Sequence, residues 1–177
     1  MATPYGHTLV GLSLFNLWFS RDDLSKNKQF WIYGLIILGA SLPDLDFIPG
    51  LFLGHGGRFH HGYFHSLGMA GLVSLALLFI LRVWDGKANF LKLAALAFSL
   101  ILSHLLLDYL TEAPRGFPFF WPFSDSHFLS PLTLFPRVER DLSKPYFLKQ
   151  ALFCFTVESF LFLPLWAASL GRKALGK

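Results

Sequence analysis

The sequence predicts an all-α membrane protein, built as a polytopic bundle of about five transmembrane helices. Two features of its composition indicate this class. Apolar residues make up 54% of the 177 residues and charged residues only 15%, which is more apolar than a small soluble core requires. Apolar runs of helical length also recur along the whole chain, separated by polar or Pro/Gly-rich stretches. We therefore treat residues 1–177 as a single integral membrane domain.

The apolar runs expected to form the spanning helices are residues 5–20, 30–50, 66–84, 89–110 and 147–170. A bilayer core takes about 20 helical residues to cross, and the last three runs meet that length. The first run is short, and no basic region of the kind found in a cleavable signal precedes it. The second run is interrupted by Pro43 and two aspartates. Either of these two runs could be a partly inserted or broken helix.

When the five helices are followed in order, a set of metal-type side chains falls at one end of the bundle. Each of them lies where a helix begins or ends on the side of residue 1, which we call the near side. The set comprises His7, Asp44, Asp46, His60, His65, His104 and Asp108. These residues are the candidate metal ligands, and the sequence therefore predicts a metal site at one membrane face.

Basic residues are distributed unequally between the two ends. The near-side segments contain Arg58, Arg115, Arg137, Arg140, Lys144 and Lys149. The shorter far-side segments contain Arg21, Lys26, Lys28, Arg82, Lys87, Lys92, Arg172, Lys173 and Lys177. By the positive-inside rule the far side, with the C-terminus, is cytoplasmic. The candidate site would then face the periplasm or cell exterior. The net charge of +4 is better explained by this topology than by nucleic-acid binding.

Two spacings support a shared site. His104 and Asp108 stand at positions i and i+4, so one helix face carries both. This pair could bind one divalent ion, or the carboxylate could simply orient the imidazole. Asp44 and Asp46 lie on a Pro-containing bend, where they could chelate a metal or accept backbone N–H groups at a helix end. Ionisable groups within membrane helices are costly to desolvate and are usually functional.

Three aspartates brought together near a low-dielectric region favour a bound cation. Such carboxylates repel one another and are driven towards protonation unless one or two divalent ions, such as Zn, Mn or Mg, offset their charge. His60, His61 and His65 form the densest histidine patch. Because Gly62 interrupts it, His60 and His65 could converge from a loop and a helix start. The patch could instead be a surface or pH-sensitive loop.

These motifs resemble the YdjM-like family of membrane-bound metal-dependent hydrolases. The ordered set is Gly6-His7-Thr8, Leu42 to Asp46, His60 to Ser66, Ser103-His104 to Thr111, and Phe120-Trp121-Pro122. The resemblance implies an integral membrane protein with a His/Asp metal site, distantly similar to zinc-dependent phospholipases C, and its ligand-type residues fall on the candidates above. The chain departs from the family pattern in its histidine block. It has His60-His61 and Phe64-His65 where the family usually shows His-Arg and Thr-His.

The near-side segment 111–146 contains the aromatic stretch from Phe117 to Phe123. This stretch is too Pro-rich for a helix and too aromatic for bulk water, so we expect it in the headgroup zone over or beside the site. It could be a plain aromatic belt, or it could admit an acyl or prenyl chain. Arg115, Arg137 and Arg140 could then meet a phosphate. Glu139 could be an added ligand or a solvated charge.

Glu158 lies about 16 Å along the last helix. A glutamate at this depth is expected to make a functional or structural polar contact, with His104 or Ser99 as possible partners.

The sequence therefore predicts a membrane metal-dependent hydrolase that cleaves an ester or phosphoester of a lipid or lipid-linked substrate. A metal-activated water would attack, and Asp44, Asp46 or Asp108 would take its proton. The candidate cofactor is one or two divalent ions, with Zn favoured. A divalent-metal transporter or metal-sensing membrane protein is the alternative. A scaffold with a purely structural polar cluster is a third. The ligands lie at one face, which favours the enzyme.

Overall fold

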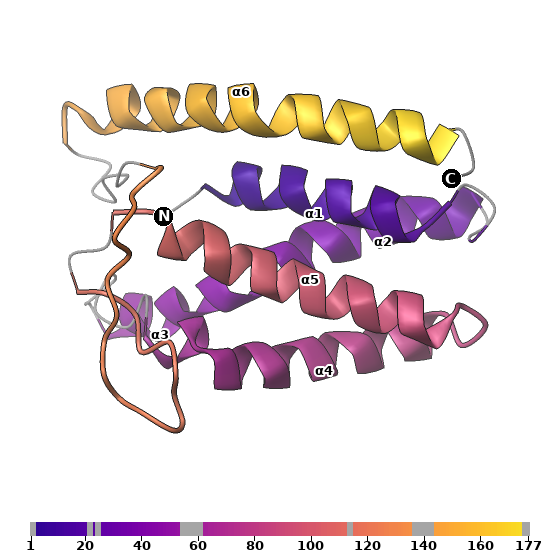
Figure 1. The fold of residues 1–177 in the computed structure, drawn as a ribbon, viewed down its shortest axis with the longest axis horizontal. Helices are drawn as coiled ribbons and strands as arrows, with labels where there is room; N and C mark the ends of the chain where they lie inside the picture. Colours follow the sequence, from indigo (N-terminus) through magenta and orange to yellow (C-terminus); the bar gives the residue numbers. More distant parts are fainter. Residues whose placement is uncertain are drawn as a thin grey trace.

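The computed structural model describes residues 3–20, 23, 26–53, 62–112, 115–135 and 144–174. Within this part the chain forms α1 (Pro4–Trp18), α2 (Lys26–Ala40), η2 (Leu42–Asp46), α3 (Phe47–Phe52), η3 (Tyr63–His65), α4 (Leu67–Trp84), α5 (Phe90–Tyr109) and α6 (Phe147–Ala174). No β-strand occurs in the described segments, where two isolated bridges are the extended pairings seen. α1, α4, α5 and α6 run along the long axis of the molecule, and α2 crosses it obliquely (Figure 1). The predicted all-α helix bundle is confirmed.

Three of the helices are long and apolar enough to cross a membrane. They are α4, α5 and α6, with mean hydropathies of 2.1, 2.1 and 1.7 over their most apolar windows. α6 buries only 17% of that window inside the protein, and its Phe160 is 81% exposed. Such an apolar outer surface is suited to hydrocarbon rather than water. α1 and α2 have 15 residues each. The first apolar run is short, as the sequence predicted.

The second apolar run is a broken helix. α2 ends at Ala40, and the chain continues as the 3-10 turn η2 and the short α3. Pro43 has no backbone N–H to donate, so it disfavours a continuing α-helix, and the Asp44 N–H turns back to the Ser41 carbonyl at 3.1 Å. Residues 30–50 are therefore not one straight span, and the bend places Asp44 and Asp46 inside the bundle, where both are buried.

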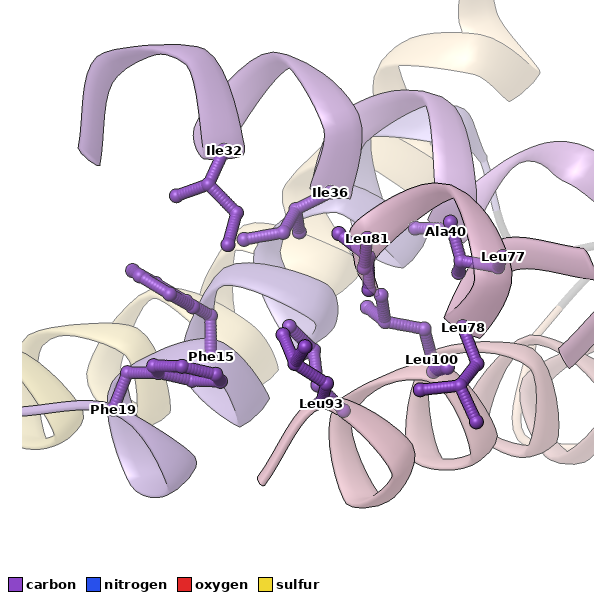
Figure 2. Close-up of a cluster of buried hydrophobic side chains, with 12 residues drawn as sticks. Phe15, Phe19, Ile32, Ile36, Ala40, Leu77, Leu78, Leu81, Leu93 and Leu100 are labelled. Carbon is purple, nitrogen blue, oxygen red and sulfur yellow. The ribbon is translucent and has the colours of Figure 1, made fainter. Parts of the chain in front are cut away.

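One large apolar core holds α1, α2, α4 and α5 together (Figure 2). It is formed by Phe15, Phe19, Ile32, Ile36, Ala40, Leu77, Leu78, Leu81, Leu93, Leu96, Ala97 and Leu100. Gly11 permits the helices to cross closely, because a Cβ atom there would lie 3.0 Å from Leu100 and 3.2 Å from Ile36. On α5 this core occupies the turns before His104, so it fills the bundle between the candidate site and the far end.

The two ends of the bundle differ in character. The start of α1, the bend after α2, the start of α4 and the end of α5 lie at one end, and the α4–α5 connection lies at the other (Figure 1). This arrangement confirms that the helix ends carrying the candidate ligands lie together.

The far end contains the ion pairs Lys28–Asp85 and Lys92–Asp23, each at 2.6 Å. Burial raises the pKa of Asp85, but its hydrogen bonds to Lys28 and to the backbone N–H groups of Lys87 and Ala88, together with the Lys28 charge, outweigh burial and leave the pKa below its usual value.

Candidate metal centre

Four buried side chains converge at the near end of the bundle. They are Asp44 from η2, His65 from η3, and His104 and Asp108 from α5. One donor atom from each lies within 4.8 Å of all the others. Two imidazole nitrogens and two carboxylate oxygens at this spacing form a group that could hold a metal ion.

Asp108 is at the centre of the group and is 0% exposed. Its Oδ2 lies 3.1 Å from His65 Nε2 and 3.4 Å from His104 Nε2. Its Oδ1 lies 3.3 Å from His7 Nε2. The i, i+4 spacing does place His104 and Asp108 on one face of α5. The same carboxylate also contacts histidines from two other segments, so it ties α1, η3 and α5 together.

His104 is oriented by a backbone carbonyl. Its Nδ1 lies 2.7 Å from the Ala40 carbonyl oxygen, so Nδ1 carries the hydrogen and Nε2 keeps its lone pair towards the cluster. Ala40 ends α2, and the last carbonyls of a helix have no partner within it. Sequence reasoning missed this contact. Pro43 signalled the helix end, but nothing in the sequence pointed to which side chain would reach its last carbonyl.

His65 lies between two aspartates that contact opposite nitrogens of its ring. Asp46 Oδ2 is 3.0 Å from Nδ1, and Asp44 Oδ1 is 3.8 Å from Nε2. The two carboxylates of the bend therefore do not form one chelating pair. Asp44 faces the cluster, whereas Asp46 lies behind the imidazole, where it can fix the ring's orientation.

The start of α4 holds His65 in place. As predicted, the α-helix begins only after Gly62, and His65 ends the short η3 turn. Ser66 caps α4 by accepting a hydrogen bond from the Met69 N–H at 3.2 Å. The Phe117 ring packs against the His65 ring with centroids 6.0 Å apart. This contact confirms the expectation that the aromatic stretch begins beside the site.

His7 approaches the group from the first turn of α1. Its ring stacks on that of His104 with centroids 3.9 Å apart and planes inclined by 18°. It is 2% exposed, and its Nδ1 has no hydrogen-bond partner among the residues described. His7 therefore adds a third buried imidazole to the site.

The secondary candidates have different outcomes. His60, His61 and Glu139 lie outside the described residues, as do Arg137 and Arg140. Arg115 is exposed in a turn of the 111–135 segment. The sequence suggested His104 or Ser99 as partners of Glu158, but Glu158 contacts neither. The reason is that α6 begins beyond the start of α1 (Figure 1). Its position along α6 is therefore level with the first turn of α1, and its carboxylate accepts a hydrogen bond from the Thr3 N–H at 2.6 Å.

The aromatic segment docks on the N-terminus of α4. The N–H groups of Leu67 and Gly68 donate to the carbonyls of Phe119 and Trp121, at 2.9 and 3.1 Å, and so satisfy two donors that a helix start leaves free. Phe120 and Phe123 point outward, with 48% and 94% exposure. The site end of the bundle therefore presents apolar side chains next to the buried histidines.

Comparison with known proteins shows the family to which the chain belongs. The family model of the YdjM inner membrane protein matches residues 1–168. The chain belongs to this family. A stretch of 97 residues is also 37% identical to the inner membrane protein YbcI of Escherichia coli (strain K12), and covers 54% of this chain and 56% of that protein. The matched region thus spans about half the length of the curated relative. No solved structure matches the chain.

Membership of the YdjM family confirms the resemblance found in the motifs. Together with the three helices able to span a membrane, it identifies the chain as an inner membrane protein. The site residues lie within the region that the family model covers.

Proposed function

We propose that this protein is a metal-dependent hydrolase embedded in the inner membrane. The observation that carries the proposal is the convergence of Asp44, His65, His104 and Asp108 from three separate segments in a buried site. Burying carboxylates side by side without a compensating charge is expensive. A divalent cation offsets that cost, and a mixed nitrogen and oxygen donor set suits Zn, with Mn as a second choice.

The chain's own residues are arranged as a first set of donors with supports behind them. His65 and His104 present Nε2 to the cluster because Asp46 and the Ala40 carbonyl contact their Nδ1 atoms. Such supports fix the tautomer and the ring orientation of a metal-binding histidine. A divalent ion bound by these donors would make a water nucleophilic near neutral pH and stabilise the charge that develops on the substrate oxygen.

Asp44 is our candidate for the residue that accepts the proton of the attacking water. Asp108 is surrounded by His7, His65 and His104, and Asp46 contacts the outer nitrogen of His65. Asp44 faces the group from η2 and places Oδ1 3.8 Å from His65 Nε2 and 3.7 Å from His104 Nε2. A general base must reach the water it deprotonates, and a water held among these donors would lie beside Asp44.

A lipid or lipid-linked ester or phosphoester is the proposed substrate class. The aromatic segment presents Phe120 and Phe123 to the surroundings at the end of the bundle where the site lies. Aromatic side chains at this level are typical of the membrane interface, and an acyl chain could pack against them. Arg115, exposed on the same segment, could bind a phosphate through its guanidinium fork.

The transporter alternative is less well supported. Transport requires a polar route from the site to both faces. On α5, the turns between the far end and His104 carry Leu93, Leu96 and Leu100, which belong to the large apolar core. Figure 2 shows this core packed between α1, α2, α4 and α5. The far end of the described chain carries the Lys28–Asp85 and Lys92–Asp23 ion pairs. This asymmetry favours a site served from one face.

The first test is the metal content of detergent-purified protein, measured by elemental mass spectrometry. Wild type is compared with Asp44→Ala and His104→Ala, and with Asp85→Ala as a matched control that removes a buried carboxylate at the far end. We expect stoichiometric metal in wild type and the control, and loss in both site variants. Metal-loaded wild type should then hydrolyse phospholipids or polyprenyl phosphates, and Asp44→Ala should not.

Two results would overturn this proposal. Protein prepared without chelator that contains no metal, and binds neither added Zn nor added Mn, would leave the structural scaffold as the best account. Metal that is bound but transported into sealed vesicles, with no hydrolysis of either lipid class, would favour the transporter.

A further inference from the structure

Glu158 makes an unusual contact between α6 and the first turn of α1. Glu158 is buried, with 1% of its surface exposed. One carboxylate oxygen accepts from the Thr3 N–H at 2.6 Å, and the other accepts from the Thr3 hydroxyl. That hydroxyl in turn accepts from the Gly6 N–H at 3.4 Å. The carboxylate is thus connected by hydrogen bonds to the free donors at the start of α1, where the helix dipole also favours a negative charge.

Gly6 makes this contact possible. A Cβ atom at position 6 would lie 2.8 Å from the Glu158 carboxyl carbon and 2.9 Å from one of its oxygens. Real Cβ atoms do not approach so closely, so with any larger residue at position 6 the Glu158 carboxylate must move from its place against the first turn of α1. The next residue is His7, which stacks on His104 and lies 3.3 Å from Asp108. Glu158 therefore acts on the one turn of α1 that contributes to the site.

We propose that Glu158 is a positioning residue for the metal site. It fixes the position of the first turn of α1 along the helix axis and its rotation about that axis, and so places His7 against Asp108. The proposal rests on the proposed function, since it assumes that the buried group binds a metal. It adds a role for α6, which supplies no side chain to the cluster and packs mainly on α1.

The same two helices provide a control for general packing. Further along the interface, the Asn16 amide donates to the Ser169 hydroxyl at 3.0 Å, and both residues are buried. This contact is also a polar α1–α6 hydrogen bond, but it lies more than two helical turns after His7. Ser169→Ala should weaken the packing of α6 on α1 without moving the first turn of α1.

The experiment measures metal affinity by chelator competition and ligand geometry by the absorption spectrum of the Co(II)-loaded protein. Wild type is compared with Glu158→Ala, Glu158→Gln and Ser169→Ala. Glu158 acts on the metal ligand Asp108 through His7, which lies 3.3 Å from that carboxylate. Loss of such support typically lowers metal affinity about 10- to 100-fold, and we expect a loss in this range for Glu158→Ala, together with an altered Co(II) spectrum. Glu158→Gln can still accept from the Thr3 N–H and should lose much less metal affinity than Glu158→Ala. Ser169→Ala should leave the affinity and spectrum unaltered.

A second comparison uses Gly6. Introduced alone, Gly6→Ala should lower the metal affinity. Combined with Glu158→Ala it should have little further effect, since substitutions of residues in direct contact do not act additively. Gly6→Ala and Glu158→Gln keep the test valid if Glu158→Ala fails to fold.

The outcomes separate the two proposals. A wild type that binds no metal would refute the proposed function itself. A wild type that binds metal, with Glu158→Ala matching its affinity and Co(II) spectrum, would refute the positioning role alone. Equal losses in Glu158→Ala and Ser169→Ala would also refute it, because they would show a general effect of helix packing.

Discussion

Asp44 and Asp46 both contact the His65 ring but have different roles in the proposed site. Asp44 and Asp46 stand two positions apart in one 3-10 turn, and each contacts a different nitrogen of the same imidazole. The one facing Nε2 lies among the other donor atoms, and the one facing Nδ1 lies outside them. In the proposed site, Asp44 is therefore a ligand and proton acceptor, whereas Asp46 orients His65.

This assignment gives a prediction about Asp46. Asp46→Ala should lower metal affinity about 10- to 100-fold, because His65 loses the group that fixes its orientation, but one equivalent should still bind at saturating metal. Asp46→Asn should have a smaller effect, since its amide oxygen can still accept from Nδ1–H. Chelator competition measures both. If Asp46→Ala abolished binding as completely as Asp44→Ala, Asp46 would be a ligand itself.

At the scale of elements, the site depends on how the aromatic segment docks on α4. The carbonyls of Phe119 and Trp121 accept from the first N–H groups of α4, directly after His65. Gly68 allows this close approach, because a Cβ atom there would lie 2.6 Å from both the Trp121 carbonyl oxygen and Pro122 Cδ. The segment and the site histidine are therefore held by the same helix end.

Two glycines of α4 test this docking. Gly68→Ala should destabilise the protein by about 1–3 kcal/mol, as overpacking does, and should also weaken metal binding by moving the segment away from His65. Gly71→Ala is the matched control, since a Cβ atom there meets nothing within 4 Å. It should be neutral or stabilise the helix by up to about 1 kcal/mol. Thermal unfolding in detergent gives the comparison, and equal stability of the two variants would contradict it.

At the scale of the whole molecule, the charge difference between the ends predicts the orientation in the membrane. Of the 15 Lys and Arg residues, nine fall in the short segments that the order of the helices in the sequence assigns to the far end. The structure brings Asp44, His65, His104 and Asp108 together, from helix ends that lie at the other end of the bundle (Figure 1). By the positive-inside rule we expect that end, with the site, to face away from the cytoplasm.

Cysteine labelling tests the orientation. Cys154, the chain's one cysteine, is buried and is replaced by alanine. Exposed reporters are then introduced as Ser126→Cys at the site end and Gly86→Cys at the far end. In intact spheroplasts, a membrane-impermeant maleimide should label the Ser126→Cys variant and spare the Gly86→Cys variant until the membrane is opened. The reverse pattern would place the site on the cytoplasmic face.

Much of the fold and the position of the site could be predicted from the sequence. Apolar runs of membrane length indicate helices because the bilayer core requires that length. Because successive helices cross the membrane in opposite directions, the sequence places His7, Asp44, His65, His104 and Asp108 at one end of the bundle. The i, i+4 spacing puts His104 and Asp108 on one helix face. These inferences need only the regular geometry of helices. His60, which lies outside the described residues, stays a prediction.

The tertiary structure alone decided how the residues divide their contacts. The Ala40 carbonyl on His104, the separate positions of Asp44 and Asp46, and the contact of Glu158 with Thr3 depend on how far each helix is shifted and rotated against its neighbours. Those shifts are set by close packing, as at Gly6 and Gly11, where a Cβ atom would lie 2.8 Å from Glu158 and 3.0 Å from Leu100. Sequence spacing specifies the face and the end of a single helix, but the partner across an interface depends on both helices together.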